Sequence, residues 1–108
     1  MYLLTGLDAI TVQNGSVTAK TGTYVALTCV LEGFQPNNES IQWSFNGDIL
    51  SVQDPRYLQQ IILKSDIYEA TLTFLSPNMD LSGEYKCKLL EFSGVINVTI
   101  LPGKGHTA

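Results

Sequence analysis

The sequence is poor in the residues from which metal sites and nucleophilic active sites are built. Among 108 residues it has one histidine and two cysteines, whereas zinc and copper sites draw most of their ligands from these two residue types. The histidine, His106, lies in the Gly- and Pro-containing segment 102–108, which predicts a flexible tail or linker that holds no side chain in catalytic geometry. Acidic residues are scattered, and nothing marks a carboxylate pair. We therefore expect no metal, no catalytic residue and no enzymatic activity.

The sequence also lacks a basic excess and a phosphate-binding loop. It has ten acidic residues against six basic ones and a net charge of −4, whereas a nucleic-acid surface needs a strong excess of Lys and Arg. Neither GxxxxGK[ST] nor GxGxxG occurs. We expect no nucleic-acid partner, no small-molecule substrate and no cofactor.

Long apolar runs are missing as well. No run exceeds four residues, as at 24–27, and about 20 are needed to span a bilayer. The N-terminus has neither the basic stretch nor the long apolar stretch of a signal peptide. The chain is therefore expected to be either cytosolic or an excised piece of a mature protein, and the two cysteines must decide between these.

Apolar and polar residues alternate with a period of two along most of the chain. In 23–31, for example, Val25, Leu27, Cys29 and Leu31 share one face, as in a strand with one buried side. The expected strands are 7–12, 16–19, 23–31, 40–46, 57–63, 68–75, 83–90 and 96–100, and no segment shows helical spacing. Short strands with frequent turn signals predict an all-β antiparallel sandwich, since a barrel with a cavity would need longer strands. We expect one domain at 7–101, an N-terminal extension at 1–6 and a flexible tail or linker at 102–108.

Four landmarks follow the order and spacing of a known signature. Cys29 and Cys87 both face inward and lie 58 positions apart, Trp43 follows the first, and Tyr85 stands two before the second in a segment that starts at Asp80. This arrangement resembles the immunoglobulin superfamily over roughly residues 7 to 101. The resemblance implies a Greek-key sandwich with an inter-sheet disulfide between the two cysteines, a tryptophan packed on it and a Tyr85 hydroxyl bonded back to the preceding corner.

The same resemblance implies an ion pair between Asp80 and Arg56, although Arg56 also fits a solvated turn. The interval between the cysteines and the short connection at 91–94 indicate an intermediate-set or compact variable-like domain. Variable domains that pair face to face carry an aromatic residue directly after the tryptophan. Here that residue is Ser44, so antibody-like chain pairing is not expected.

Three Asn-x-Ser/Thr sequons help to predict whether the domain is intracellular or extracellular. They begin at Asn14, Asn38 and Asn97, and each is a site for N-linked glycosylation in a secreted protein. Buried cysteines also stay reduced in intracellular domains of this kind, but the three sequons together favour an oxidised, extracellular domain.

The candidate binding surface is the polar face that carries Gln42, Ser44, Asn46, Glu84, Lys86 and Lys88. Phe92, expected at the tip of a turn, is its apolar anchor or else folds over the end of the sandwich. The opposite face, with Thr28, Val30, Thr71 and Thr73 and an extension at Tyr57, Gln59 and Gln60, is the alternative, and either face fits a solvated sheet.

We therefore expect a recognition domain of a cell-surface adhesion or receptor protein, anchored to a membrane, that binds a protein on another cell or a copy of itself. The alternative is a structural spacer in a tandem array, extracellular or of the intracellular muscle type.

Overall fold

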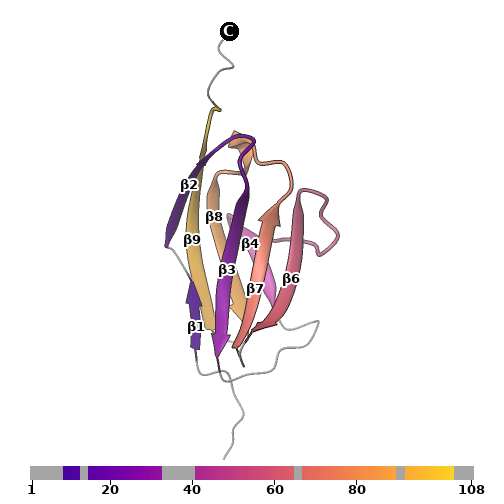
Figure 1. Ribbon diagram of the computed structural model, residues 1–108. Coiled ribbons are helices and arrows are strands. Elements are labelled where there is room, and N and C mark those ends of the chain that lie inside the picture. Colours follow the sequence, from indigo (N-terminus) through magenta and orange to yellow (C-terminus); the bar gives the residue numbers. More distant parts are fainter. Residues whose placement is uncertain (1–8, 13–14, 33–40, 65–66, 90–91, 104–108) are drawn as a thin grey trace, which may run out of the picture.

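The computed structural model describes residues 9–12, 15–32, 41–64, 67–89 and 92–103. The chain forms two stacked β-sheets (Figure 1). One sheet has the order β1 (Ala9–Val12), β3 (Val25–Glu32), β7 (Ile67–Phe74), β6 (Tyr57–Lys64). The other has the order β2 (Ser16–Lys20), β9 (Phe92–Leu101), β8 (Gly83–Leu89), β4 (Gln42–Phe45), β5 (Asp48–Ile49). The predicted all-β sandwich is confirmed.

One strand pair departs from the expected antiparallel arrangement. All other pairs among the described strands are antiparallel, but β2 runs parallel to β9, with Ser16 opposite Asn97. The reason is that the chain changes sheets between β1, which pairs with β3, and β2. After this change β2 continues along the outer edge of β9 (Figure 1).

The core lies between the sheets and is built from the inward residues of the period-two pattern. Its buried members include Val25, Leu27, Cys29, Leu31, Trp43, Ala70, Leu72, Phe74, Tyr85, Cys87, Leu89, Ile96, Val98 and Ile100. No charged or polar residue is buried among the described residues. Burial of apolar surface is therefore the main force that holds the two sheets together.

A tight turn joins β4 to β5 and explains an element that the sequence pattern does not reveal. Asn46 and Gly47 have φ values of 51° and 93°, as a two-residue hairpin turn requires. The Asn46 side-chain oxygen accepts from the Glu84 N–H at 2.8 Å, and the Asn46 N–H donates to the Glu84 carbonyl at 2.8 Å. The resulting β5 has two residues, too few for a period of two to show.

The second unexpected element is a short 3-10 helix, η1 (Met79–Leu81), before β8. Its start is capped by Asn78, whose side chain accepts from the Asp80 N–H. Within the described part of the chain, no helix has the length and hydropathy of a membrane span.

Candidate functional site

A pair of buried tyrosines ties the two sheets together. The Tyr85 hydroxyl donates to the Leu81 carbonyl at 2.7 Å, which confirms the expected contact with the corner before β8. The Tyr57 hydroxyl lies 2.8 Å from that of Tyr85 and is the donor, since Tyr85 has already used its proton. Burial raises the pKa of both phenols above the usual value. Tyr57 was expected to extend the outer surface of the β6 sheet, and its burial corrects that expectation: the first residue of β6 faces the core.

The two cysteines meet in the middle of the core. Both are fully buried and are neighbours in the core. In the thiol form, the contact with Cys87, and after it burial, raises the pKa of Cys29 well above its usual value, so the Cys29 thiol is a poor nucleophile. Trp43 lies opposite Cys87 in the β4–β8 register and is buried in the same cluster. The Cys29–Cys87 disulfide stays a prediction.

Arg56 has a different partner from the expected one. Its guanidinium binds the Asp54 carboxylate with Nη2 at 2.7 Å and Nε at 3.0 Å, and its carbon Cζ lies 5.3 Å from the centre of the Tyr57 ring. Asp80 instead sits in η1. A carboxylate two residues away is already held near the guanidinium by the chain, so the local pair forms in place of the Asp80–Arg56 pair. The hydrogen bonds from Arg56 lower the pKa of Asp54.

Four of the seven predicted binding residues meet in a hollow on the outer face of the five-stranded sheet. The hollow measures about 230 Å³ and is lined by Gln42, Ser44, Gly47, Ile49, Lys86 and Lys88. Strand register accounts for this group, because Gln42 lies opposite Lys88 and Ser44 lies opposite both Lys86 and Ile49. We call these six residues the lysine hollow.

Two members of the lysine hollow were not foreseen. Gly47 and Ile49 belong to the hairpin turn and to the two-residue β5, and the Ile49 side chain is 65% exposed. The Asn-Gly turn itself is the one signal that places them beside β4.

The other three predicted binding residues lie outside the lysine hollow. Asn46 and Glu84 are joined to each other through the turn contact. Phe92 begins β9 and pairs with Leu89, so it stands in a strand and not at the tip of a turn; its side chain lies outside the described part.

The sequons fall in different places. Asn97 is exposed in β9 between Ser16 and Glu84. Asn14 and Asn38 lie outside the described residues.

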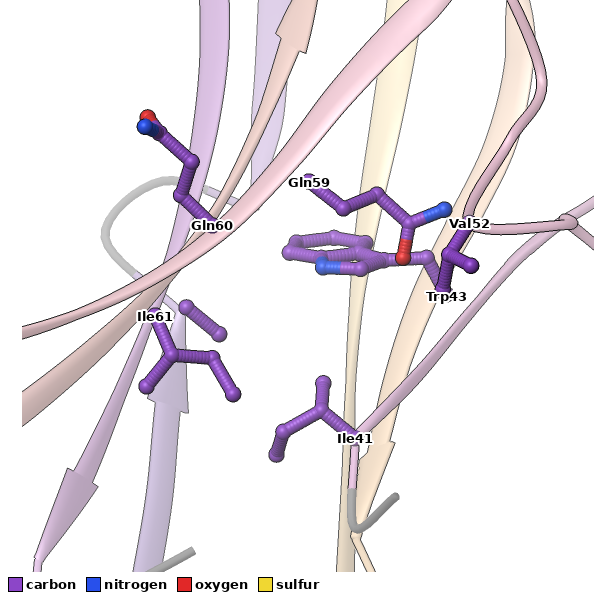
Figure 2. Close-up of a pocket in the computed structure, with 7 residues that line it drawn as sticks. Ile41, Trp43, Val52, Gln59, Gln60 and Ile61 are labelled. Atoms are coloured by element: carbon purple, nitrogen blue, oxygen red, sulfur yellow. The ribbon is translucent and has the colours of Figure 1, made fainter. Parts of the chain in front are cut away.

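A second hollow opens between the two sheets beside β6 (Figure 2). It measures about 220 Å³ and is lined by Ile41, Trp43, Val52, Gln59, Gln60, Ile61 and Ala70. We call it the tryptophan cleft. None of these residues is charged. Among the described residues no group of three or more His, Cys, Asp or Glu side chains is placed to hold a metal ion.

Residues 9–89 match the sequence model of the immunoglobulin domain. The chain belongs to the immunoglobulin family. A search of curated proteins returns no match. Immunoglobulin domains are in general binding or structural modules and not enzymes.

Solved structures share the fold of this immunoglobulin domain. A complex of Dpr2 Ig1-Ig2 with DIP-Theta Ig1-Ig3 contains a similar domain, with a TM-score of 0.74, 19% identity and coverage of 94% of this chain and 35% of that chain. The first immunoglobulin domain of the mouse polymeric immunoglobulin receptor has a TM-score of 0.68 and 17% identity, and the match covers 88% of this chain and 96% of that chain. The Ig-like domain of human obscurin-like protein 1 has a TM-score of 0.67 and 20% identity, and the match covers 92% of this chain and 91% of that chain.

Proposed function

We propose that this immunoglobulin domain is an extracellular recognition module of a membrane-anchored adhesion or receptor protein. In this proposal the lysine hollow binds an acidic group on the surface of a protein partner. The observation that carries it is the presence of two neighbouring lysines, Lys86 and Lys88, in one hollow of a chain whose net charge is −4.

Neither lysine has an acidic partner among the described residues. Two ammonium groups with no counter-charge among these residues attract and orient an acidic partner. Ile49, which is exposed at the rim, adds apolar contact next to this charge. A polar surface with one apolar residue suits a specific and reversible contact more than an obligate dimer.

The test uses a fluorescent tetramer of the whole chain, with staining of cells that each display one ectodomain from the same organism. We expect a partner whose binding weakens with rising salt and is lost in the double variant Lys86→Glu/Lys88→Glu. Lys20→Glu is the control, because it makes the same kind of substitution on β2, away from the hollow; each single variant, Lys86→Glu and Lys88→Glu, matches it in charge change and should weaken binding where Lys20→Glu does not. Binding that survives the double variant would contradict the proposal.

A second copy of the chain is included among the partners. Glu84, Lys86 and Lys88 follow one another on the outer face of β8, so a two-fold axis near Lys86 places Glu84 of each copy against Lys88 of the other. Sedimentation over a range of concentrations tests this arrangement. A dimer that Lys88→Glu breaks and Glu84→Lys/Lys88→Glu restores supports it, and a monomer at every concentration excludes it.

The second candidate function is a spacer in a tandem array, favoured by the similarity to a domain of obscurin-like protein 1. The extracellular proposal is supported by the three sequons. Intact mass after alkylation, with and without prior reduction, separates the two. The alkylation is carried out in denaturant, because both cysteines are buried in the native fold. Two alkylated cysteines in unreduced protein from its natural source would contradict the extracellular assignment.

A further inference from the structure

Among the described residues, nothing pairs with the outer edge of β6, which carries several exposed apolar side chains. β6 is the last strand of its sheet, with β7 on one side only. From Tyr57 to Leu63 it contains no charged residue and no proline, and its one charged residue is the last one, Lys64. Charges and proline are two of the features by which exposed edge strands avoid pairing with other chains. Ile61, Ile62 and Leu63 are all exposed, at 38%, 39% and 58%. Such an edge is a template for an additional strand.

The register shows which backbone groups face this edge. The Leu75 N–H donates to the Arg56 carbonyl at 2.9 Å, and Arg56 precedes the first β6–β7 pair, Tyr57 with Phe74. Since the hydrogen-bonding direction alternates along an antiparallel strand, residues 58, 60 and 62 bond to β7. Gln59, Ile61 and Leu63 therefore turn their N–H and carbonyl groups outward, where the described chain provides no backbone partner.

The residues with open backbone groups are also those whose side chains face the other sheet. Gln59 and Ile61 line the tryptophan cleft together with Trp43, and Figure 2 shows the Trp43 ring between the Gln59 side chain above it and the Ile61 and Ile41 side chains below it. Opposite residues on neighbouring strands point their side chains to the same face. A residue paired with Ile61 on an added strand therefore points its side chain into the cleft.

The residues that line the cleft indicate which kind of side chain it can bind. Five of its seven lining residues are apolar and the other two are neutral glutamines, one of which, Gln59, already donates to the Ser51 carbonyl at 3.1 Å. An apolar cavity of about 150 Å³ suffices for benzene, so about 220 Å³ holds one Phe or Leu side chain. A charged side chain finds no counter-charge among these residues and loses part of its hydration.

We propose that the β6 edge from Gln59 to Leu63 and the tryptophan cleft together bind an extended, uncharged segment of a partner protein. The segment adds a fifth strand to the β1-β3-β7-β6 sheet and places one Phe or Leu side chain in the cleft. Main-chain hydrogen bonds then supply affinity and the cleft supplies selectivity. The β6 edge belongs to the other sheet from the lysine hollow, and Trp43 and the lysine hollow lie on opposite faces of β4, so the two surfaces act independently.

The test uses capped peptides Thr-Val-Thr-Xaa-Thr-Val-Thr, with Xaa as Phe, Leu, Ala or Glu. Trp43 is the one tryptophan of the chain, so its emission reports on the cleft itself, and amide NMR signals report on residues 59–63. We expect Phe and Leu peptides to shift both signals and to bind roughly ten-fold or more tightly than the Glu peptide. Equal binding of all four peptides, or no binding at millimolar concentration, would overturn the proposal.

Backbone pairing is tested on the peptide, which leaves the protein fold untouched. Two peptides are N-methylated at alternate residues, one at the odd positions and one at the even positions. One of them loses the N–H groups that face β6, and the other loses the N–H groups that face solvent. We expect one frame to abolish binding and the other to preserve it. If both methylated peptides bind, no added strand forms and the proposal fails.

Two protein variants provide the matched pair. Ile61→Lys places a charge in the cleft, whereas Ile62→Lys changes a residue of nearly equal exposure on the other face of β6. We expect Ile61→Lys to abolish binding of the Phe peptide and Ile62→Lys to preserve it. Circular dichroism checks that both variants are folded. Lys86→Glu/Lys88→Glu must retain the peptide, which separates this surface from the lysine hollow. A dimer of the free chain that Ile61→Lys breaks, without peptide binding, would overturn the proposal and make a second copy the occupant.

Discussion

At the scale of single residues, the two tyrosine hydroxyls form a chain that ends on a backbone carbonyl. Tyr57 donates to Tyr85, and Tyr85 donates to Leu81. Tyr85→Phe leaves the Leu81 carbonyl and the Tyr57 hydroxyl without this partner, and we expect it to lower the free energy of unfolding by about 1–3 kcal/mol. Tyr57→Phe keeps the bond to Leu81 and is expected to cost less, about 0.5–1.5 kcal/mol.

Urea unfolding measures both changes. Tyr24→Phe is the control, because that side chain is 80% exposed and its substitution should leave stability unchanged. A loss for Tyr57→Phe as large as that for Tyr85→Phe would contradict a separate contribution from the bond between Tyr85 and Leu81.

The pair of Arg56 with Asp54 predicts a small, pH-dependent coupling. Because hydrogen bonds from Arg56 lower the pKa of Asp54 in the folded state, the pair stabilises the fold above the usual Asp pKa of about 4. This contribution is lost as the pH falls through the lower folded pKa. A double-mutant cycle with Arg56→Gln and Asp54→Asn is expected to give about 0.2–1 kcal/mol at pH 7, since the guanidinium is half exposed.

The same cycle with Asp80→Asn tests the expectation that the family resemblance suggested. Asp80 makes no described contact with Arg56 and should show no coupling. A coupling to Asp80 that exceeds the coupling to Asp54 would contradict the pairing in the structure.

At the scale of elements, the β4–β5 turn packs against the start of β8, and the absence of a side chain at Gly83 makes this possible. A Cβ there would lie 2.6 Å from Cε1 of Phe45 and 2.7 Å from Oδ1 of Asn46. Gly83→Ala must push both away, and we expect a loss of about 1–3 kcal/mol in thermal or urea unfolding. Gly15→Ala, where a Cβ meets nothing within 4 Å, is the control and should change stability by less than about 0.5 kcal/mol. Equal losses in both variants would argue against this close approach.

Strands proved predictable where their length allowed a periodic pattern to show. The alternation at 23–31 and 83–90 places Cys29, Tyr85 and Cys87 inward, as observed. By contrast, β5 is too short for a period of two, and η1 depends on an Asn78 cap that resembles an ordinary turn. The sequence therefore predicted that the β4 and β8 residues of the lysine hollow share one face, but it revealed neither the hollow nor the contribution of Gly47 and Ile49.

The tryptophan cleft was not predicted at all. It depends on how far β6 stands from β4 at the open side of the sandwich, and sequence periodicity carries no information about that distance. Ile61 and Ile62 illustrate this limit, since identical neighbouring residues have nearly equal exposure and only one of them lines the cleft.

At the scale of the whole molecule, the cysteine pair predicts a redox-dependent stability. A bridge between Cys29 and Cys87 would close a loop of nearly sixty residues and stabilise the fold by about 4 kcal/mol in the chain-entropy model. We expect oxidised protein to unfold at a higher urea concentration than reduced protein. The Cys29→Ala/Cys87→Ala variant is the control and should respond to no reductant. If wild-type protein kept under oxidising conditions behaves the same with and without reductant, no bridge forms.

The parallel pairing of β2 with β9 also has a consequence for synthesis on the ribosome. Ser16 cannot pair with Asn97 until Asn97 has been synthesised. At about 5–20 residues per second, synthesis of the chain between them takes roughly 4 to 16 seconds. Throughout that time β2 is out of the ribosome before its hydrogen-bonding partner exists. Its sequence, Ser-Val-Thr-Ala-Lys, is short, largely polar and charged at its end, which suits a segment that must remain soluble while the rest of the domain is being made.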